Sequence, residues 1–362
     1  MADRLKELCA RIASWLACAC LLTGCQTAEY YTQAIHGQCQ IWNRQQSIAA
    51  ILEDPKAPGP LKERLRLVLE IRAFAEEELK LPANGHYLRY ADLGRRFAVW
   101  NVYAAPEFSF TARSWWYPVV GRLDYRGYFS EAKARRYAAK LEEQGFDVHV
   151  GGVTAYSTLG WFRDPVLNTF VHDEHADLAE LLFHELAHQR LFIAGDTDFN
   201  EAFATAVAEE GLRRWMESRH DPAAYEQYLA QVRRTDEFVH LVTTARTRLS
   251  EIYDDSNRGT ILSTEEKRRE KQRVIEELRM SYERLKAQWG GRKEYDEWFK
   301  QSLNNAQLNT VDTYHHLVPA FRHLLRQNGN NLDQFFKSVE TFRKLSKLER
   351  RAKLDALAAS DR

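Results

Sequence analysis

The feature that most constrains the fold and chemistry of this chain is an apolar stretch that carries three ionisable side chains. Residues 181–192 (LLFHELAHQRLF) are apolar on most sides of a helix, which predicts a buried helix. His184 and His188 are four residues apart, so both imidazoles lie on one face and can bind one metal ion. Glu185 lies one helical step from that face, where it can reach a water on the metal. The pattern predicts a zinc site; the alternative is two hydrogen-bonded core histidines beside a buried acid.

A third ligand is expected shortly after this helix. Gly195 is a helix stop signal, and Asp198 can cap the next helix. Glu201 then lies in or near the first turn of that helix and faces the two histidines. Catalytic zinc sites take three protein ligands and keep a fourth position open. The expected ligands are His184, His188 and Glu201, with Asp198 as the alternative third ligand.

Residues 1–24 have the features of a secretory signal. A weakly basic start precedes an apolar run at 12–22, which is too short to span a bilayer as a helix. Leu-Thr-Gly-Cys at 22–25 resembles the lipobox of bacterial lipoproteins, in which the chain is cut before the cysteine and the thiol carries lipid. We therefore expect a membrane-anchored lipoprotein, attached through Cys25 and facing the periplasm; Gln26, which is not aspartate, favours the outer membrane. The alternative is an ordinary buried helix at 12–22.

Charge and cysteine content exclude several other kinds of protein. The chain has 51 Lys and Arg residues against 51 Asp and Glu residues, so no basic excess is present for binding nucleic acid. After cleavage, Cys25 and Cys39 are the remaining cysteines, and lipidation of Cys25 leaves a single thiol. An intramolecular disulfide and a Cys-rich zinc ribbon are therefore not expected.

The rest of the chain predicts an α+β fold in one domain at 25–362. A small mixed β part is expected at about 90–160, followed by a mainly helical part at about 173–346, and the charged tail after 347 is expected to fray. Strands are expected at 97–105, 115–120 and 146–150. Helices are expected at 40–80, 130–144, 222–248, 263–300, 313–326 and 331–346.

Three further segments are candidates for roles near the metal. Residues 153–160 (VTAYSTLG) could form an edge strand that pairs with a substrate backbone, or an ordinary strand with Tyr156 in the core. Tyr314 is a candidate catalytic residue that donates a hydrogen bond to the developing oxyanion; core packing is the alternative. Glu107 could bind a free α-amine, or it could pair with an arginine at the end of a strand.

The chain resembles the bacterial family of predicted aminopeptidases, which are lipoprotein-like zinc metallopeptidases. The resemblance includes the His184 motif and Asn-Glu-x-x-Ala at 200–204, a pattern typical of gluzincin peptidases. It extends over nearly the whole mature chain through Tyr30–Ala34, Trp100–Val102, Ala105–Ser109, Tyr125–Phe129, Ala155–Phe162, Phe199–Glu201, Asn304–Ala306 and Thr313–Tyr314. It implies a gluzincin-like core, Zn²⁺ as cofactor and aminopeptidase activity on a peptide substrate, with Glu185 as general base.

Two other functions are compatible with the same motif. A non-catalytic lipoprotein could hold a structural zinc ion or none, although a structural site has no use for Glu185, a carboxylate that is not a ligand. A zinc amidase acting on a cell-wall substrate would use the same residues, because hydrolysis at a metal does not specify the acyl group.

Overall fold

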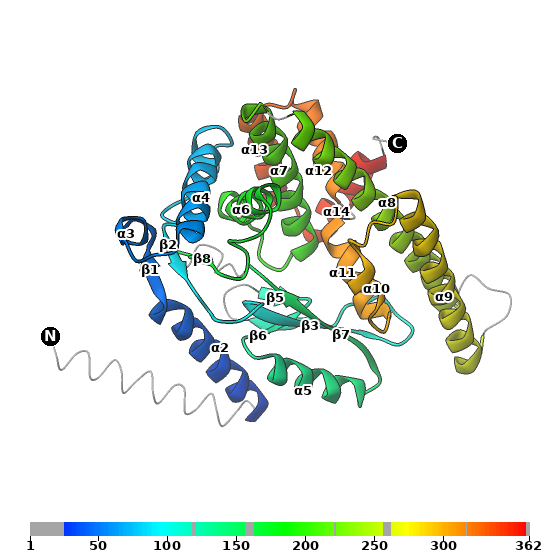
Figure 1. Ribbon diagram of the computed structural model, residues 1–362. Helices are drawn as coiled ribbons and strands as arrows, with labels where there is room; N and C mark the ends of the chain where they lie inside the picture. The colour runs from blue at the N-terminus through cyan, green and yellow to red at the C-terminus, as the bar shows by residue number, and fades with distance from the viewer. Residues whose placement is uncertain are drawn as a thin grey trace.

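The computed structural model describes residues 25–117, 121–155, 163–220, 222–255, 262–315 and 317–359. These residues form an α+β fold in which small sheets lie beside a larger helical part, as the sequence predicted (Figure 1). The predicted signal at 1–24 and most of the candidate strand at 153–160 lie outside the described residues.

Three helices begin the described chain. They are α2 (Cys25–Asn43), α3 (Ile48–Glu53) and α4 (Gly59–Glu77). Helix α4 begins beside Pro60, whose fixed φ suits a first helical turn, and it buries Leu65, Val68 and Ile71. Within the described ranges, no helix is both long and apolar enough to cross a bilayer.

Within the described residues, the strands form two three-stranded sheets and a hairpin. One sheet has the order β1 (Gln45–Ser47), β2 (Arg89–Ala91) and β8 (Val166–Leu167), and the hairpin consists of β4 (Trp115–Tyr117) and β5 (Gly121–Leu123). The second sheet has the order β6 (Arg126–Tyr128), β3 (Val99–Pro106) and β7 (Phe146–Val153), with β3 antiparallel to both neighbours. Helix α5 (Glu131–Glu142) covers one face of this sheet with Ala134, Ala138 and Leu141 (Figure 1).

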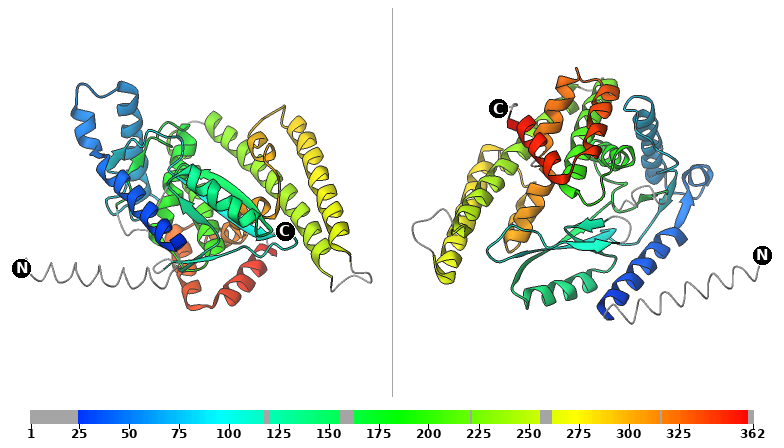
Figure 2. Two further views of the ribbon diagram at one scale, coloured as in Figure 1. Left: turned by 90° about the horizontal axis from the view of Figure 1, so that it is seen from below. Right: turned by 180° about the vertical axis from the view of Figure 1, so that it is seen from behind.

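The helical part begins with α6 (His175–Arg190) and α7 (Thr197–Ser218), which pack side by side through a short connecting loop. Next come α8 (Pro222–Tyr253) and α9 (Thr264–Gln288), an antiparallel pair that projects from the molecule with its own apolar core (Figure 2). The remaining elements are α10 (Asp296–Phe299), α11 (Asn305–His315), α12 (Val318–Gln327), α13 (Leu332–Glu340), the 3-10 helix η1 (Thr341–Lys344) and α14 (Lys347–Ala359).

The expectation of a frayed tail after residue 347 is wrong. Helix α14 packs against α12, and its Leu354 is fully buried in the main core. Arg350 is also buried, and its Nε donates to Asp196 Oδ2 at 2.7 Å, just before α7 begins. This buried ion pair joins distant segments and keeps the charged helix α14 folded against the protein. The composition of the tail alone does not reveal such a pair.

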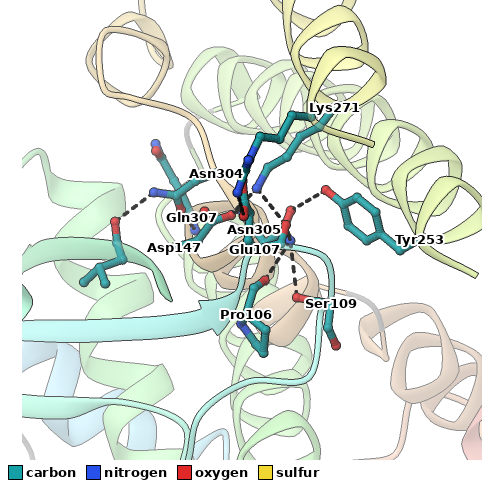
Figure 3. Close-up of polar contacts among 11 residues, drawn as sticks. Pro106, Glu107, Ser109, Asp147, Tyr253, Lys271, Asn304, Asn305 and Gln307 are labelled. Atoms are coloured by element: carbon teal, nitrogen blue, oxygen red, sulfur yellow. Dashed lines mark hydrogen bonds and ion pairs between the residues drawn. The ribbon is translucent and has the colours of Figure 1, made fainter. Parts of the chain in front are cut away.

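A buried polar network joins the second sheet to α9 and α11 (Figure 3). Asn305 Nδ2 donates to the carbonyl oxygens of Pro106, Glu107 and Ser109 at 3.1, 3.0 and 3.3 Å. Lys271 Nζ lies 2.5 Å from Asp147 Oδ2 and donates to the Glu107 carbonyl at 2.9 Å. Because buried carbonyls are costly to leave unpaired, the network holds α11 in place between the sheet and α7.

Candidate metal centre

Helix α6 places the predicted motif at the centre of the main core. Leu182, Phe183, Leu186 and Ala187 are buried on its apolar sides. The helix ends at Arg190, and the chain turns through Gly195, whose φ of +79° lies in the left-handed region that favours glycine. The predicted buried helix is therefore confirmed. Packing of its apolar sides in the core fixes the orientation of the side that carries the two histidines.

Asn200 holds the loop between α6 and α7. The Ile193 N–H donates to Asn200 Oδ1, and Asn200 Nδ2 donates to the Ile193 carbonyl, both at 2.8 Å. Asn200 is 1% exposed, so its amide is committed to this loop. The two hydrogen bonds set where α7 begins relative to α6, and they bring Glu201 opposite the histidines.

His184, His188 and Glu201 come together as a group that could hold a metal ion. Their ligand atoms all lie within 4.8 Å of one another. The Glu201 Oε2 atom is 3.2 Å from His184 Nε2 and 3.7 Å from His188 Nε2. The two imidazole rings meet edge to face with their centroids 4.9 Å apart. This is the predicted set of three ligand residues.

Charge and burial act in opposite directions on this group. Burial alone would raise the pKa of Glu201, but His188 and His184 together lower it below its usual range. Burial alone would lower the pKa of His188, but the Glu201 carboxylate raises it. A cation bound between these groups would take the place of a proton, because the imidazole nitrogens must be deprotonated to act as ligands.

Glu185 lies beside the group and is not a member of it. Its Oε2 atom is buried and has no hydrogen-bond partner within the described ranges. Burial raises the pKa of Glu185, and the neighbouring histidines reduce that effect. A buried carboxylate oxygen without a partner can accept a proton from a small molecule that enters the site.

Asp198, the alternative third ligand, lies in the first turn of α7 but outside the metal-binding group. Arg351 Nη1 of α14 is 3.5 Å from Asp198 Oδ2. The cap position predicted for Asp198 belongs instead to Asp196. The geometry therefore favours Glu201 as the third ligand.

Two other predicted residues have different outcomes. Both Glu107 carboxylate oxygens accept hydrogen bonds from Arg268 at 2.7 and 2.9 Å, so the alternative of a strand-end acid paired with an arginine holds. Tyr314 lies near the C-terminal end of α11, but its side chain is outside the described part of the structure, as is Tyr156.

Tyr125 lies close to the metal centre, and no role was predicted for it. It follows β5, whose Gly121 packs so tightly on the α6–α7 loop that an added Cβ would be 3.3 Å from the Gly195 nitrogen. Tyr125 also lines a small pocket with Thr197, one helical turn before Glu201. Burial raises the pKa of Tyr125 well above its usual value, and the charges of Glu201 and Glu185 add to this. The phenol therefore stays protonated and can donate a hydrogen bond.

Comparison with known proteins gives one finding at the level of a family. A family model described as "Putative aminopeptidase" matches residues 29–354. No curated protein and no solved structure matches the chain. The matched region includes the two helices that carry His184, His188 and Glu201, and it covers most of the chain. The chain therefore belongs to this family of peptidases, whose described activity is that of an aminopeptidase.

Proposed function

We propose that this protein is a zinc-dependent aminopeptidase that uses Glu185 as its general base. The observation that carries the proposal is the meeting of His184, His188 and Glu201 beside a buried carboxylate that is not a ligand. The family description supports a peptidase that acts on the amino end of its substrate.

The residues present fit a zinc ion. Two imidazole nitrogens and one carboxylate oxygen are ligands that zinc prefers in catalytic sites. With bonds of about 2.0–2.1 Å in a tetrahedron, ligand atoms lie about 3.4 Å apart. The separations of 3.2 and 3.7 Å from Glu201 Oε2 to the two Nε2 atoms lie on either side of that value. All three ligand atoms lie within 4.8 Å of one another, so the three side chains could bind one ion together.

A zinc ion, when bound, supplies a Lewis acid for the scissile carbonyl and makes a coordinated water more acidic. Glu185 would accept a proton from the attacking water through its buried Oε2 and transfer it to the leaving amine. Glu201 would neutralise part of the metal charge, and Asn200 would keep the α6–α7 loop in position. The raised pKa of Glu185 brings its basicity closer to what proton transfer near neutral pH requires.

Metal removal and substrate comparison test this function. The full chain, purified in mild detergent, is treated with a chelator, and hydrolysis of an aminoacyl amide is measured before and after zinc is returned. We expect activity to disappear with the metal and to return with about one zinc ion per chain. The N-acetylated form of the same amide should be a poor substrate. Turnover that survives full metal removal would contradict the proposal, and preferred cleavage of a cell-wall amide would favour the amidase.

Tyr125 is our candidate donor to the developing oxyanion, in addition to Tyr314. We expect Tyr125→Phe to lower kcat by about 10²-fold with the zinc content unchanged, because one donor of this kind contributes about that much. The matched control is Tyr103→Phe, since the Tyr103 ring lies 5.8 Å from that of Tyr125 and its hydroxyl accepts a hydrogen bond from Asn101. Equal effects of the two variants would show that only packing is lost.

We also propose that the chain is cleaved before Cys25 and anchored to the outer membrane by lipid on that cysteine. Helix α2, which the structure describes from Cys25 onward, exposes Tyr31, Ile35 and Trp42 on one side, at 36, 64 and 42%. Aromatic and aliphatic side chains on one face of a helix suit the edge of a bilayer. Mass spectrometry of protein extracted from membranes should show a chain that starts at a lipidated Cys25. An intact Met1 in the mature protein would refute this anchor.

A further inference from the structure

A second polar site lies on the opposite face of the sheet from the helical part, where α2, β6 and α5 meet. We call it the Arg126 pocket; Arg126, Lys133, Arg136 and Lys140 line it together with Tyr30 and Tyr137. Figures 1 and 2 show the N-terminal end of α2 beside α5 at this place. The pocket is formed by residues that take no part in the metal centre.

Arg126 is held in the pocket between two aromatic rings. Its guanidinium carbon lies 4.0 Å from the centre of the Tyr30 ring and 5.0 Å from that of Tyr137. The Nε atom is buried, and no hydrogen-bond partner for it is present among the described residues. An enclosed guanidinium usually donates to a carboxylate or a phosphate, because its planar donors match two oxygen atoms at once. The two aromatic walls orient Arg126 but leave its donors available.

Three further cations extend from one face of α5 toward Arg126. Lys133, Arg136 and Lys140 are spaced three and four residues apart, so they lie along one side of the helix. Within the ranges that the structure describes, none of the three forms an ion pair. By contrast, Arg135, which directly precedes Arg136, pairs with Glu131 at 2.7 Å. Glu29 is the one acidic residue that lines the pocket, so four positive charges face one negative charge.

We infer that the Arg126 pocket binds the phosphate group of an anionic phospholipid. Several cations with open donors around an enclosed guanidinium suit a phosphate, whose oxygens accept several charge-assisted hydrogen bonds. The position of the pocket favours a lipid over free phosphate. Tyr30 is five residues after Cys25, so the pocket wall lies about 8 Å along α2 from the proposed site of lipid attachment. The choice of a lipid source rests on the proposed anchor, whereas the phosphate site itself does not.

Lipid titration of the full chain in non-ionic detergent tests this inference. Native mass spectrometry measures retention of dihexanoyl phosphatidylglycerol, of dihexanoyl phosphatidylcholine and of inorganic phosphate. We expect one phosphatidylglycerol to bind at least about tenfold more tightly than either other probe. The double variant Lys133→Gln/Arg136→Gln should weaken its binding about 30-fold, since each basic residue near an anionic headgroup contributes about a fivefold factor.

Arg135→Gln is the matched control, because it removes one positive charge from the same helix at a position that already has a partner. It should bind phosphatidylglycerol like the unmodified protein, and all these variants should keep their peptidase activity. Equal binding by the control and the double variant would overturn the pocket. If inorganic phosphate binds as tightly as phosphatidylglycerol, the ligand is not specifically a lipid. If Cys25 carries no lipid but the pocket still binds the phosphate group, the proposed anchor is wrong and the phosphate site stands.

Discussion

We expect the Glu185→Gln variant to retain one zinc ion per chain and to lose about 10²- to 10⁴-fold in kcat, the usual contribution of a positioned general base. Glutamine keeps the shape of the side chain but cannot accept the proton. Because Glu185 is outside the group formed by His184, His188 and Glu201, the metal ligands remain in place. Elemental analysis and turnover of an aminoacyl amide, measured on the same preparation, separate these two effects.

Glu180→Gln is the matched control for this variant. Glu180 lies one turn before His184 on the same helix and is half-buried, but it is not part of the metal-binding group. The control should therefore keep both zinc and turnover. Loss of zinc in Glu185→Gln would mean that Glu185 is a ligand or orients one. Near-normal turnover with zinc retained would assign the base to another residue, and a wild type that binds zinc tightly but hydrolyses no amide would favour a structural site.

The Glu201→Gln variant is expected to bind zinc at least about 100-fold more weakly. Loss of a residue that only supports a ligand already costs about 10- to 100-fold in metal affinity, and Glu201 is the proposed direct ligand that brings the one carboxylate of the group. Activity at limiting zinc should disappear with the metal. Competition against a coloured chelator measures the dissociation constant, and circular dichroism verifies that the variant is folded.

Asp198→Asn provides the comparison for this experiment, since Asp198 is the other acidic residue in the first turns of α7. Its carboxylate is placed toward Arg351, so its loss should leave zinc affinity unchanged. The reverse pattern, with weak zinc binding in Asp198→Asn and full affinity in Glu201→Gln, would exchange their roles. Equal and small effects of both would place the third ligand elsewhere in the chain.

Local features of the sequence were sufficient for several helices, the main strands and the two histidines. The helical prediction for 40–80 is wrong in part, because β1 lies at Gln45–Ser47, and the helix expected at 313–326 is divided between α11 and α12. The spacing of His184 and His188 depends only on the period of a helix, and that period is set by backbone hydrogen bonds within α6. The strand β3, the helix α5 after Ser130 and the long pair α8 and α9 likewise follow from short-range patterns. The order of these elements also indicated the α+β class before any contact between them was known.

Contacts between distant segments decided the rest. Asp198 and Glu201 are three residues apart and so occupy neighbouring positions on one helix, which helical periodicity cannot distinguish. Arg351, more than a hundred residues later, pairs with the first, and the packing of α7 on α6 turns the second toward the histidines. The sequence makes Glu107 a candidate for binding an amine, but its carboxylate is paired with Arg268 of α9. Tyr125, which follows β5, lines a pocket with Thr197 of α7 and is close enough to Glu201 for that charge to raise the pKa of its phenol. The sequence determines which chemistry is available, but which residues meet depends on how the core packs, because packing joins positions that have no local relationship along the chain.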